Sequence, residues 1–290
     1  MVSTSLATSA LGQANATAGW ADGFVKTNGE YVTIGSIMVK TNSSLDSEEY
    51  KRYCWRTDQL AKIMNSESVN TTGLIEVGAH ELLKDYPKRT GGYDFLMIAT
   101  ERYGLKGERD KARSLARELI GGSAPEKVKL FAKGILNRLD SMNNPITLHF
   151  KSVDGREINL AALRGKVVLV DFWATDCAGC VAELPRVKAA YDKFHGQGLE
   201  VIGISCDTDK EKLNKFIVKN ELPWPQYCDG KIQTENRLTQ EFGIDGIPHM
   251  FLVDKKGCLR FDDVRASDQP QRKEDTTSVE EKITKLLAED

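Results

Sequence analysis

Two cysteines, Cys177 and Cys180, stand three positions apart where the apolar segment 167–172 gives way to a stretch with helical spacing. On one helical turn their Cα atoms would lie about 5–6 Å apart, which permits a disulfide without backbone movement. The first cysteine falls at the helix N-terminus, where unpaired N–H groups and the helix dipole stabilise a thiolate. We therefore expect Cys177 to be the attacking sulfur and Cys180, one turn into the helix, to be the shielded resolving thiol.

The sequence around this pair alternates between strand-like and helix-like patterns. Residues 146–150 and 157–160 flank Asp154-Gly155, an arrangement that predicts a β-hairpin. Beyond the hairpin, strands alternate with helices, which implies crossover connections and a mostly parallel sheet with helices on both faces. The expected strands cover 167–172, 199–205, 249–254 and 258–264, and the expected helices cover 178–195, 209–219 and 235–242.

A helical region precedes this α/β region. Apolar residues recur at helical spacing between residues 45 and 141, and glycine and proline interrupt them. The polar segment 141–145 ends in a proline and suits a domain boundary. Because 290 residues suffice for two cores, we expect a helical domain over 45–141, a candidate for partner binding, and an α/β domain over 145–290. The N-terminal segment 1–44 is poorly defined by its sequence, although residues 31–39 are compatible with a short strand.

The charge balance argues against a nucleic-acid partner. The chain has 40 basic and 42 acidic side chains, so it has no net positive field to hold phosphates. No apolar run approaches the roughly 18 residues of a membrane-spanning helix. The N-terminal residues lack the basic region and the apolar region of a secretory signal. We therefore expect no nucleic acid and no membrane span in this chain.

The cysteine spacing also occurs in half of a zinc site, which is the first alternative to a redox pair. The chain has no second such pair, and its histidines show no ligand spacing. We therefore expect no metal and no cofactor besides the disulfide itself. An inert structural disulfide is the second alternative. The remaining cysteines and the histidines are Cys54, Cys206, Cys228, Cys258, His80, His149, His195 and His249.

One set of residues carries a family pattern: 163–175, Cys177, Cys180, Glu183-Leu184-Pro185, Gly246-Ile247-Pro248 and 251–254. Through this set, residues 145–265 resemble the TlpA/ResA-like thiol:disulfide oxidoreductases of the thioredoxin superfamily, which are related to the AhpC/TSA proteins. The resemblance implies a thioredoxin-like fold, a mixed sheet with flanking helices and an N-terminal β-hairpin, to which this chain adds an N-terminal all-α domain. Two departures concern the redox potential and the choice of partner. Asp176 stands where the family usually has tryptophan, and Ala178-Gly179 replaces a proline-containing dipeptide.

The resemblance also assigns roles to two carboxylates. Glu183 matches an acid found near the active site of ResA-like proteins, and Asp171 matches the buried aspartate of thioredoxin. Either could take the proton of Cys180 when that thiol attacks a mixed disulfide. The alternatives are an ordinary surface residue for Glu183 and a satisfied polar group at the strand end for Asp171.

The resemblance predicts a client-binding loop around Pro248. A cis peptide bond before Pro248 would turn the backbone of Ile247 toward the disulfide, where it could pair with a client strand. An ordinary trans turn is the alternative. Trp173 is expected to pack beside the same site, and we group it with Ile247 and Pro248 as candidate substrate-binding residues.

Two further cysteines are close enough in the expected fold to suggest a second disulfide. Cys206 ends one expected strand, and Cys228 lies on a segment expected to run beside that end. They are candidates for a second disulfide, with buried free thiols as the alternative.

The function implied by the resemblance is that of an enzyme, a thiol:disulfide oxidoreductase that exchanges electrons with client cysteines and with an upstream redox partner. The direction of electron flow stays open. A peroxiredoxin-type thiol peroxidase is one alternative. The sites of that family have a Thr or Ser three residues before the cysteine, whereas this chain has Ala174 there. A non-catalytic binding module is the other. The resemblance favours a bacterial protein in the periplasm or another extracytoplasmic compartment, with a signal or anchor removed.

Overall fold

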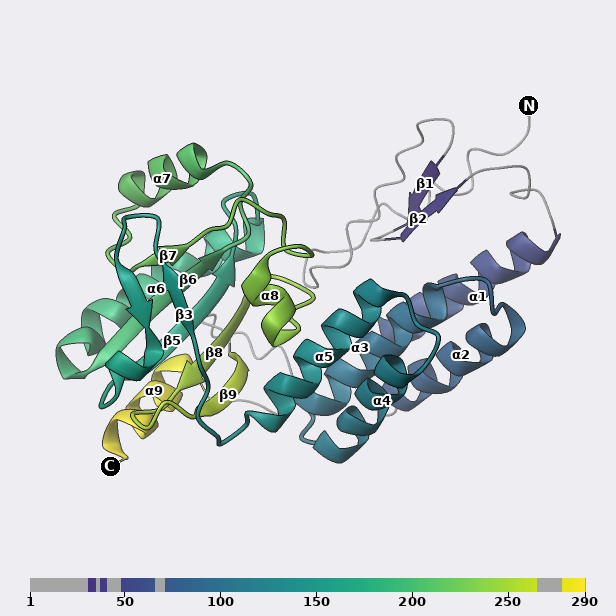
Figure 1. The fold of residues 1–290 in the computed structure, drawn as a ribbon, viewed down its shortest axis with the longest axis horizontal. Helices are drawn as coiled ribbons and strands as arrows, with labels where there is room; N and C mark the ends of the chain where they lie inside the picture. The colour runs from purple at the N-terminus through teal and green to yellow at the C-terminus, as the bar shows by residue number, and fades with distance from the viewer. Residues whose placement is uncertain (1–30, 35–36, 41–47, 66–70, 265–277, 290) are drawn as a thin grey trace. The chain divides into compact units, whose positions relative to one another are not determined.

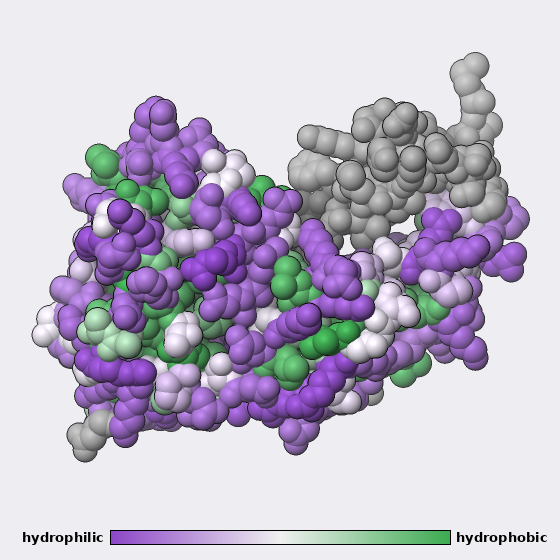
Figure 2. Space-filling view, viewed as in Figure 1, coloured by the Kyte–Doolittle hydropathy of each residue, from purple (hydrophilic) through white to green (hydrophobic). Residues whose placement is uncertain are grey.

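The computed structural model describes residues 31–34, 37–40, 48–65, 71–264 and 278–289. The chain divides into two units, Met1–Arg102 and Tyr103–Asp290. On the face shown in Figure 2, hydrophilic side chains cover most of the described surface and smaller hydrophobic patches interrupt them. Among the described helices, none combines the length and the apolar composition that a membrane span requires.

The described part of the first unit is mainly helical. Its helices α1 and α2 approach closely at Gly78, where a Cβ would lie 2.3 Å from the Leu60 side chain. Of the segment predicted as poorly defined, residues 31–34 and 37–40 form an antiparallel pair, and the rest lies outside the described residues. The elements are β1 (Tyr31–Ile34), β2 (Ile37–Lys40), α1 (Glu48–Met64), α2 (Thr71–Asp85) and α3 (Gly91–Leu105), the last of which contains the division between the units.

In the second unit, the end of α3 is followed by a helical hairpin, α4 (Arg109–Gly121) and α5 (Glu126–Asp140). The predicted boundary at 141–145 differs from the observed division, because α5 packs directly against α8 (Arg237–Phe242) of the α/β region. A Cβ on Gly134 would lie 2.3 Å from the carbonyl oxygen of Gln240, so only glycine allows this approach. The hairpin is therefore part of the α/β unit.

A five-stranded mixed sheet forms the centre of this unit, in the order β7-β6-β5-β8-β9. β5 is parallel to β6 and antiparallel to β8, and β6 is parallel to β7 while β8 is antiparallel to β9. The predicted hairpin forms a separate two-stranded sheet, β3 with β4. The strands are β3 (His149–Lys151), β4 (Glu157–Asn159), β5 (Val167–Trp173), β6 (Leu199–Ser205), β7 (Gln226–Tyr227), β8 (His249–Val253) and β9 (Leu259–Val264).

The two faces of β5 contribute to two separate apolar cores, because successive side chains of a strand point to opposite faces. Val167, Leu169 and Trp173 pack with the inner faces of α6 (Ala178–Phe194), α7 (Lys210–Lys219) and α9 (Val279–Ala288). Val168, Val170 and Phe172 pack with α8 and the β3–β4 hairpin. This arrangement of helices on both faces of a sheet is the predicted thioredoxin-like fold (Figure 1), and α6 begins shortly after the C-terminal end of β5.

Candidate active site

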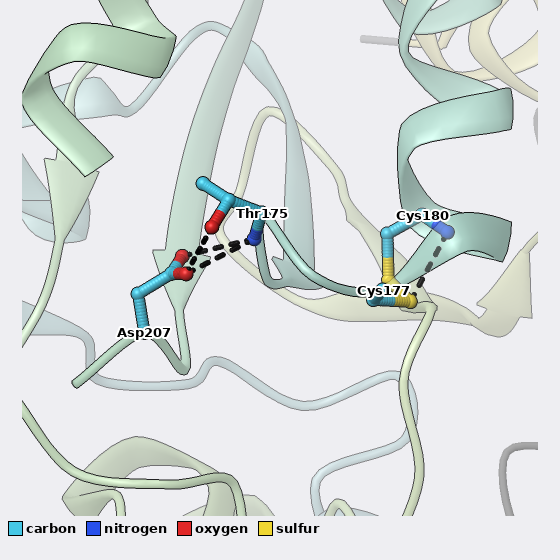
Figure 3. The surroundings of a disulfide bond; sticks show 4 residues. All are labelled: Thr175, Cys177, Cys180 and Asp207. Atoms are coloured by element: carbon cyan, nitrogen blue, oxygen red, sulfur yellow. Dashed lines mark hydrogen bonds between the residues drawn. A yellow bond between two sulfur atoms is a disulfide. The ribbon is translucent and has the colours of Figure 1, made fainter. Parts of the chain in front are cut away.

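Cys177 and Cys180 form a disulfide at the start of α6 (Figure 3). Their Cα atoms lie 5.2 Å apart, as the spacing on one helical turn predicts. Cys177 is partly exposed, whereas Cys180 is only 3% exposed and belongs to the core beneath α6. An incoming sulfur can therefore reach Cys177 and not Cys180, which confirms the expected order of accessibility.

The backbone at the start of α6 is arranged to stabilise negative charge on Cys177. Cys177 is the N-cap of the helix, and its Sγ accepts a hydrogen bond of 3.1 Å from the amide of Cys180. Amide N–H groups of the first helical turn have no partner within the helix, so they favour an anion at this position. On reduction, the same groups stabilise a Cys177 thiolate.

A buried carboxylate fixes the loop that leads to Cys177. Both oxygens of Asp207 accept hydrogen bonds of 3.1 Å from the amide of Thr175, and Oδ1 also accepts one from the Thr175 hydroxyl (Figure 3). The hydroxyl of Ser205 donates to the other oxygen of Asp207 at 2.8 Å. Sequence reasoning missed this support. The available signal was that Asp207 follows β6 while Thr175 follows the parallel neighbour β5, so both lie at the carboxyl edge of the sheet.

A charged pair lies beside the disulfide at the surface. The Lys212 ammonium on α7 pairs with the carboxylate of Asp176, the residue before Cys177. The hydrogen bond to Asp176 raises the pKa of Lys212. Because both side chains are exposed, this pair affects the charge seen by an approaching partner more than it affects stability.

The two predicted carboxylates lie on the side of the sheet that carries the disulfide. Asp171 is 3% exposed and shares its strand face with Val167 and Leu169, the face covered by α6. Glu183 is 6% exposed and follows Cys180 by one helical turn on the inner side of α6. The alternative of an ordinary surface position for Glu183 is therefore wrong, because the side chain is buried.

The loop before β8 faces the cysteine pair. The Ile247–Pro248 peptide bond is cis. Gly179, which lies between the two cysteines, is so close that a Cβ there would lie 3.5 Å from Cδ of Pro248. The partly buried Ile247 packs against both cores of the unit. Ile247 and Pro248 are thus beside the disulfide and accessible at the surface.

Trp173, predicted to be a substrate-binding residue, is buried in the core and not exposed beside the site. It is only 1% exposed, and its indole Nε1–H donates a hydrogen bond of 2.9 Å to Oε1 of Gln226. The side chain also packs against Phe216 of α7 at a ring-centroid distance of 5.5 Å. Trp173 therefore lies in the core beneath the site and supports the end of β5.

The second disulfide that the sequence suggested is not formed, because Cys206 and Cys228 are both free and buried. The thiol of Cys228 is directed at the backbone carbonyl of Asp207, which accepts its hydrogen bond at 3.2 Å. Burial raises the pKa of both thiols, and neighbouring carboxylates, Asp207 first, raise that of Cys206 further. Both are therefore poor nucleophiles at neutral pH.

The described residues contain no cluster of three or more His, Cys, Asp and Glu side chains arranged to hold a metal ion.

Comparisons with known proteins identify relatives of the α/β region. Residues 144–262, which include both cysteines, match the AhpC/TSA family. Over 108 residues the chain is 34% identical to probable nucleoredoxin 2 of Oryza sativa subsp. japonica, covering 37% of this chain and 27% of the relative. It is 32% identical over 108 residues to the thiol-disulfide oxidoreductase ResA of Geobacillus thermodenitrificans, covering 37% of this chain and 60% of the relative. The matches thus span less than two thirds of either relative.

Solved structures give matches of the same kind. The thioredoxin domain of a thiol-disulfide oxidoreductase from Bacteroides vulgatus is 29% identical, with a TM-score of 0.37, and covers 41% of this chain and 85% of that one. A thiol:disulfide interchange protein from Bacteroides sp. is 28% identical, with a TM-score of 0.37, and covers 43% of this chain and 81% of that one.

Proposed function

We propose that this chain, whose α/β region is a thioredoxin-superfamily domain, is a thiol:disulfide oxidoreductase that exchanges electrons with cysteines of client proteins. One observation carries the proposal: an accessible sulfur at the N-cap of α6, Cys177, is joined to a buried sulfur one turn later, Cys180. This asymmetry separates the sulfur that meets the client from the sulfur that completes the reaction.

The reaction runs through two thiol–disulfide exchanges. In the reducing direction, the Cys177 thiolate attacks one sulfur of a client disulfide, and the other client sulfur leaves as a thiolate that takes up a proton. Cys180 then loses its proton and attacks Cys177. The Cys177–Cys180 disulfide forms, the second client sulfur leaves, and two electrons have passed to the client. The oxidising direction is the same sequence reversed.

We propose that the carboxylates Glu183 and Asp171 accept the proton of Cys180 when this thiol attacks the mixed disulfide. Both are buried on the side of the sheet covered by α6, and Glu183 follows Cys180 by one turn. A thiol that attacks inside a core needs a base from the protein, because water has little access there. This role predicts that the second exchange becomes slow when either carboxylate is removed.

Glu183→Gln and Asp171→Asn are expected to slow the attack of Cys180 by about 100-fold or more and to leave the attack of Cys177 unchanged. A chromogenic aromatic disulfide separates the two steps in a single turnover, since the first aromatic thiolate reports attack by Cys177 and the second reports resolution. Glu200→Gln is the matched control, because Glu200 lies at the far end of β6. Wild-type rates for the second phase in both variants would contradict the assignment.

The client strand is expected to bind along Ile247, whose backbone precedes the cis bond to Pro248 beside Gly179. An extended client strand gains main-chain hydrogen bonds to an exposed backbone segment, and contacts of its side chains then supply specificity. Beyond the client we propose an upstream redox partner, a bacterial source and an extracytoplasmic location. These extensions rest on the resemblance to TlpA/ResA-like proteins, and fractionation of the source cells with alkylation trapping tests the location.

The proposed function predicts one reversible two-thiol transition in the folded protein, without an added cofactor. Equilibration in graded reduced and oxidised dithiol buffers, followed by alkylation and mass analysis of the Cys177–Cys180 peptide, measures its potential. Known dithiol oxidoreductases lie between about −270 and −120 mV. A value near the lower end identifies a client reductase, and one near the upper end identifies an oxidase. A pair that cannot be reduced while the protein stays folded would instead make the domain a binding module.

A further inference from the structure

A buried arginine lies behind the cis-proline loop. Arg138, on α5, is only 1% exposed, and its Nε donates a hydrogen bond of 2.9 Å to Oδ2 of Asp262 on β9. Burial alone would raise the pKa of Asp262, but Arg138 and His249 hold it well below its ordinary value. Asp262 is therefore charged at neutral pH, and the two side chains form a buried ion pair.

The same guanidinium binds the first end of the loop. Its Nη1 donates to the carbonyl oxygens of Phe242 and Gly243, with the bond to Gly243 at 2.9 Å. Gly243 ends α8 in a left-handed conformation and opens the segment that continues to Pro248. Gly134, one turn before Arg138, packs against the amide of Gly243, where a Cβ would lie 2.3 Å away.

The ion pair also reaches the second end of the loop. Oδ1 of Asp262 lies 2.8 Å from Nε2 of His249, the residue that follows Pro248. The His249 side chain packs edge-on against Phe172, on the face of β5 opposite to the disulfide. His249 is thus a neighbour of the loop and not a base for the cysteines.

Two more carboxylates face this cluster. Asp263 lies 3.8 Å from the other ring nitrogen of His249. Asp245 lies within the loop, and burial raises its pKa to about 6. The charge of Arg138 lowers this pKa, and the charge of Asp263 raises it. Arg138 therefore supplies the positive charge that balances several acids around one short loop.

We propose that Arg138 is a positioning residue for the redox site, which holds both ends of residues 243–249 and so places the cis-proline loop beside Gly179. The inference rests on the proposed function and deepens it. A rigid arginine fork with three acceptors is suited to this task, because its donors are fixed relative to one another. The loop pairs with an extended, cysteine-containing client strand, so its placement affects protein clients and not small dithiols.

The experiment compares the wild-type full chain with the double variant Arg138→Met/Asp262→Asn, which removes both charges of the Arg138–Asp262 ion pair together. With insulin as the disulfide-containing probe, kcat/KM is expected to fall about tenfold, mainly through KM. The rate at which dithiothreitol reduces the Cys177–Cys180 disulfide, and the redox equilibrium constant, are expected to change less than about twofold. Arg113→Met is the matched control, because Arg113 pairs with Asp140 within the α4–α5 hairpin.

An unchanged KM for insulin in the folded double variant would overturn the proposal, and so would an equal fall in the insulin and dithiothreitol rates. If the double variant does not fold, Arg138→Lys decides, since lysine keeps the charge and loses the fixed fork. The same selective rise in KM is expected there, and a wild-type KM would overturn the proposal. Failure of the proposed function gives a different result. The wild-type protein would then not reduce insulin, and dithiothreitol would not reduce its Cys177–Cys180 disulfide.

Discussion

Cys180→Ser is expected to trap the protein in a covalent complex with its clients, joined through Cys177. The variant keeps the accessible sulfur at the N-cap of α6 and loses the buried sulfur that resolves the mixed disulfide. Turnover should fall at least about a thousandfold, because the second exchange has no nucleophile. Non-reducing electrophoresis and mass spectrometry of the trapped species measure the outcome, and added dithiothreitol should release it.

The other cysteines supply the controls for this result. Cys177→Ser should lose turnover to the same extent and trap nothing, because the remaining Cys180 is buried. Cys206→Ser and Cys228→Ser should keep turnover, since burial raises the pKa of both thiols and keeps them protonated. A covalent complex that forms through Cys180 in the Cys177→Ser variant would reverse the assigned order and contradict the accessibility argument.

The site was predictable where its chemistry follows from local sequence. A strand, a cysteine pair and a helix in succession are enough to place Cys177 at an N-cap and Cys180 inside, because both positions depend on one helical turn. Burial of Glu183 was not predictable from that turn alone. It depends on which side of α6 faces the sheet, and the packing of the helix decides this.

The supporting residues could be predicted less well, because they come from distant parts of the chain. Thr175 and Asp207 meet through the parallel pairing of β5 and β6, which the sequence suggests but does not specify by residue. Arg138 lies on a helix whose pattern indicated only an amphipathic helix. Its neighbours Gly243 and Asp262 are more than a hundred residues away, so no local signal marks the contact.

The domain boundary shows the same limit. The polar segment 141–145 has the composition of a linker, and the helical hairpin before it has the pattern of a separate bundle. What joins α5 to the α/β region is a pair of glycines, Gly134 and Gly243, that let two backbones touch. Because this contact is between glycines, which have no side chains, it produces no hydrophobic pattern in the sequence from which it could be predicted.

Gly134→Ala tests this union and is expected to destabilise the α/β unit by about 3 kcal/mol. The new Cβ would lie 2.3 Å from the carbonyl oxygen of Gln240 and from the amide of Gly243, so backbone would have to move on both sides. Gly121→Ala is the matched control on α4, where nothing lies within 4 Å of an added Cβ, and it should be neutral or stabilise by up to about 0.5 kcal/mol.

Hydrogen exchange at the β5 amides is the measurement, because β5 is the central strand of the sheet and is a separate element from α5. If the hairpin is part of the α/β unit, the Gly134→Ala change lowers protection throughout β5, since the sheet and α5 unfold as one cooperative unit. If the hairpin instead belonged to a separable helical domain, as the linker-like segment 141–145 predicts, the same change would loosen α5 and leave the protection of β5 at its wild-type level.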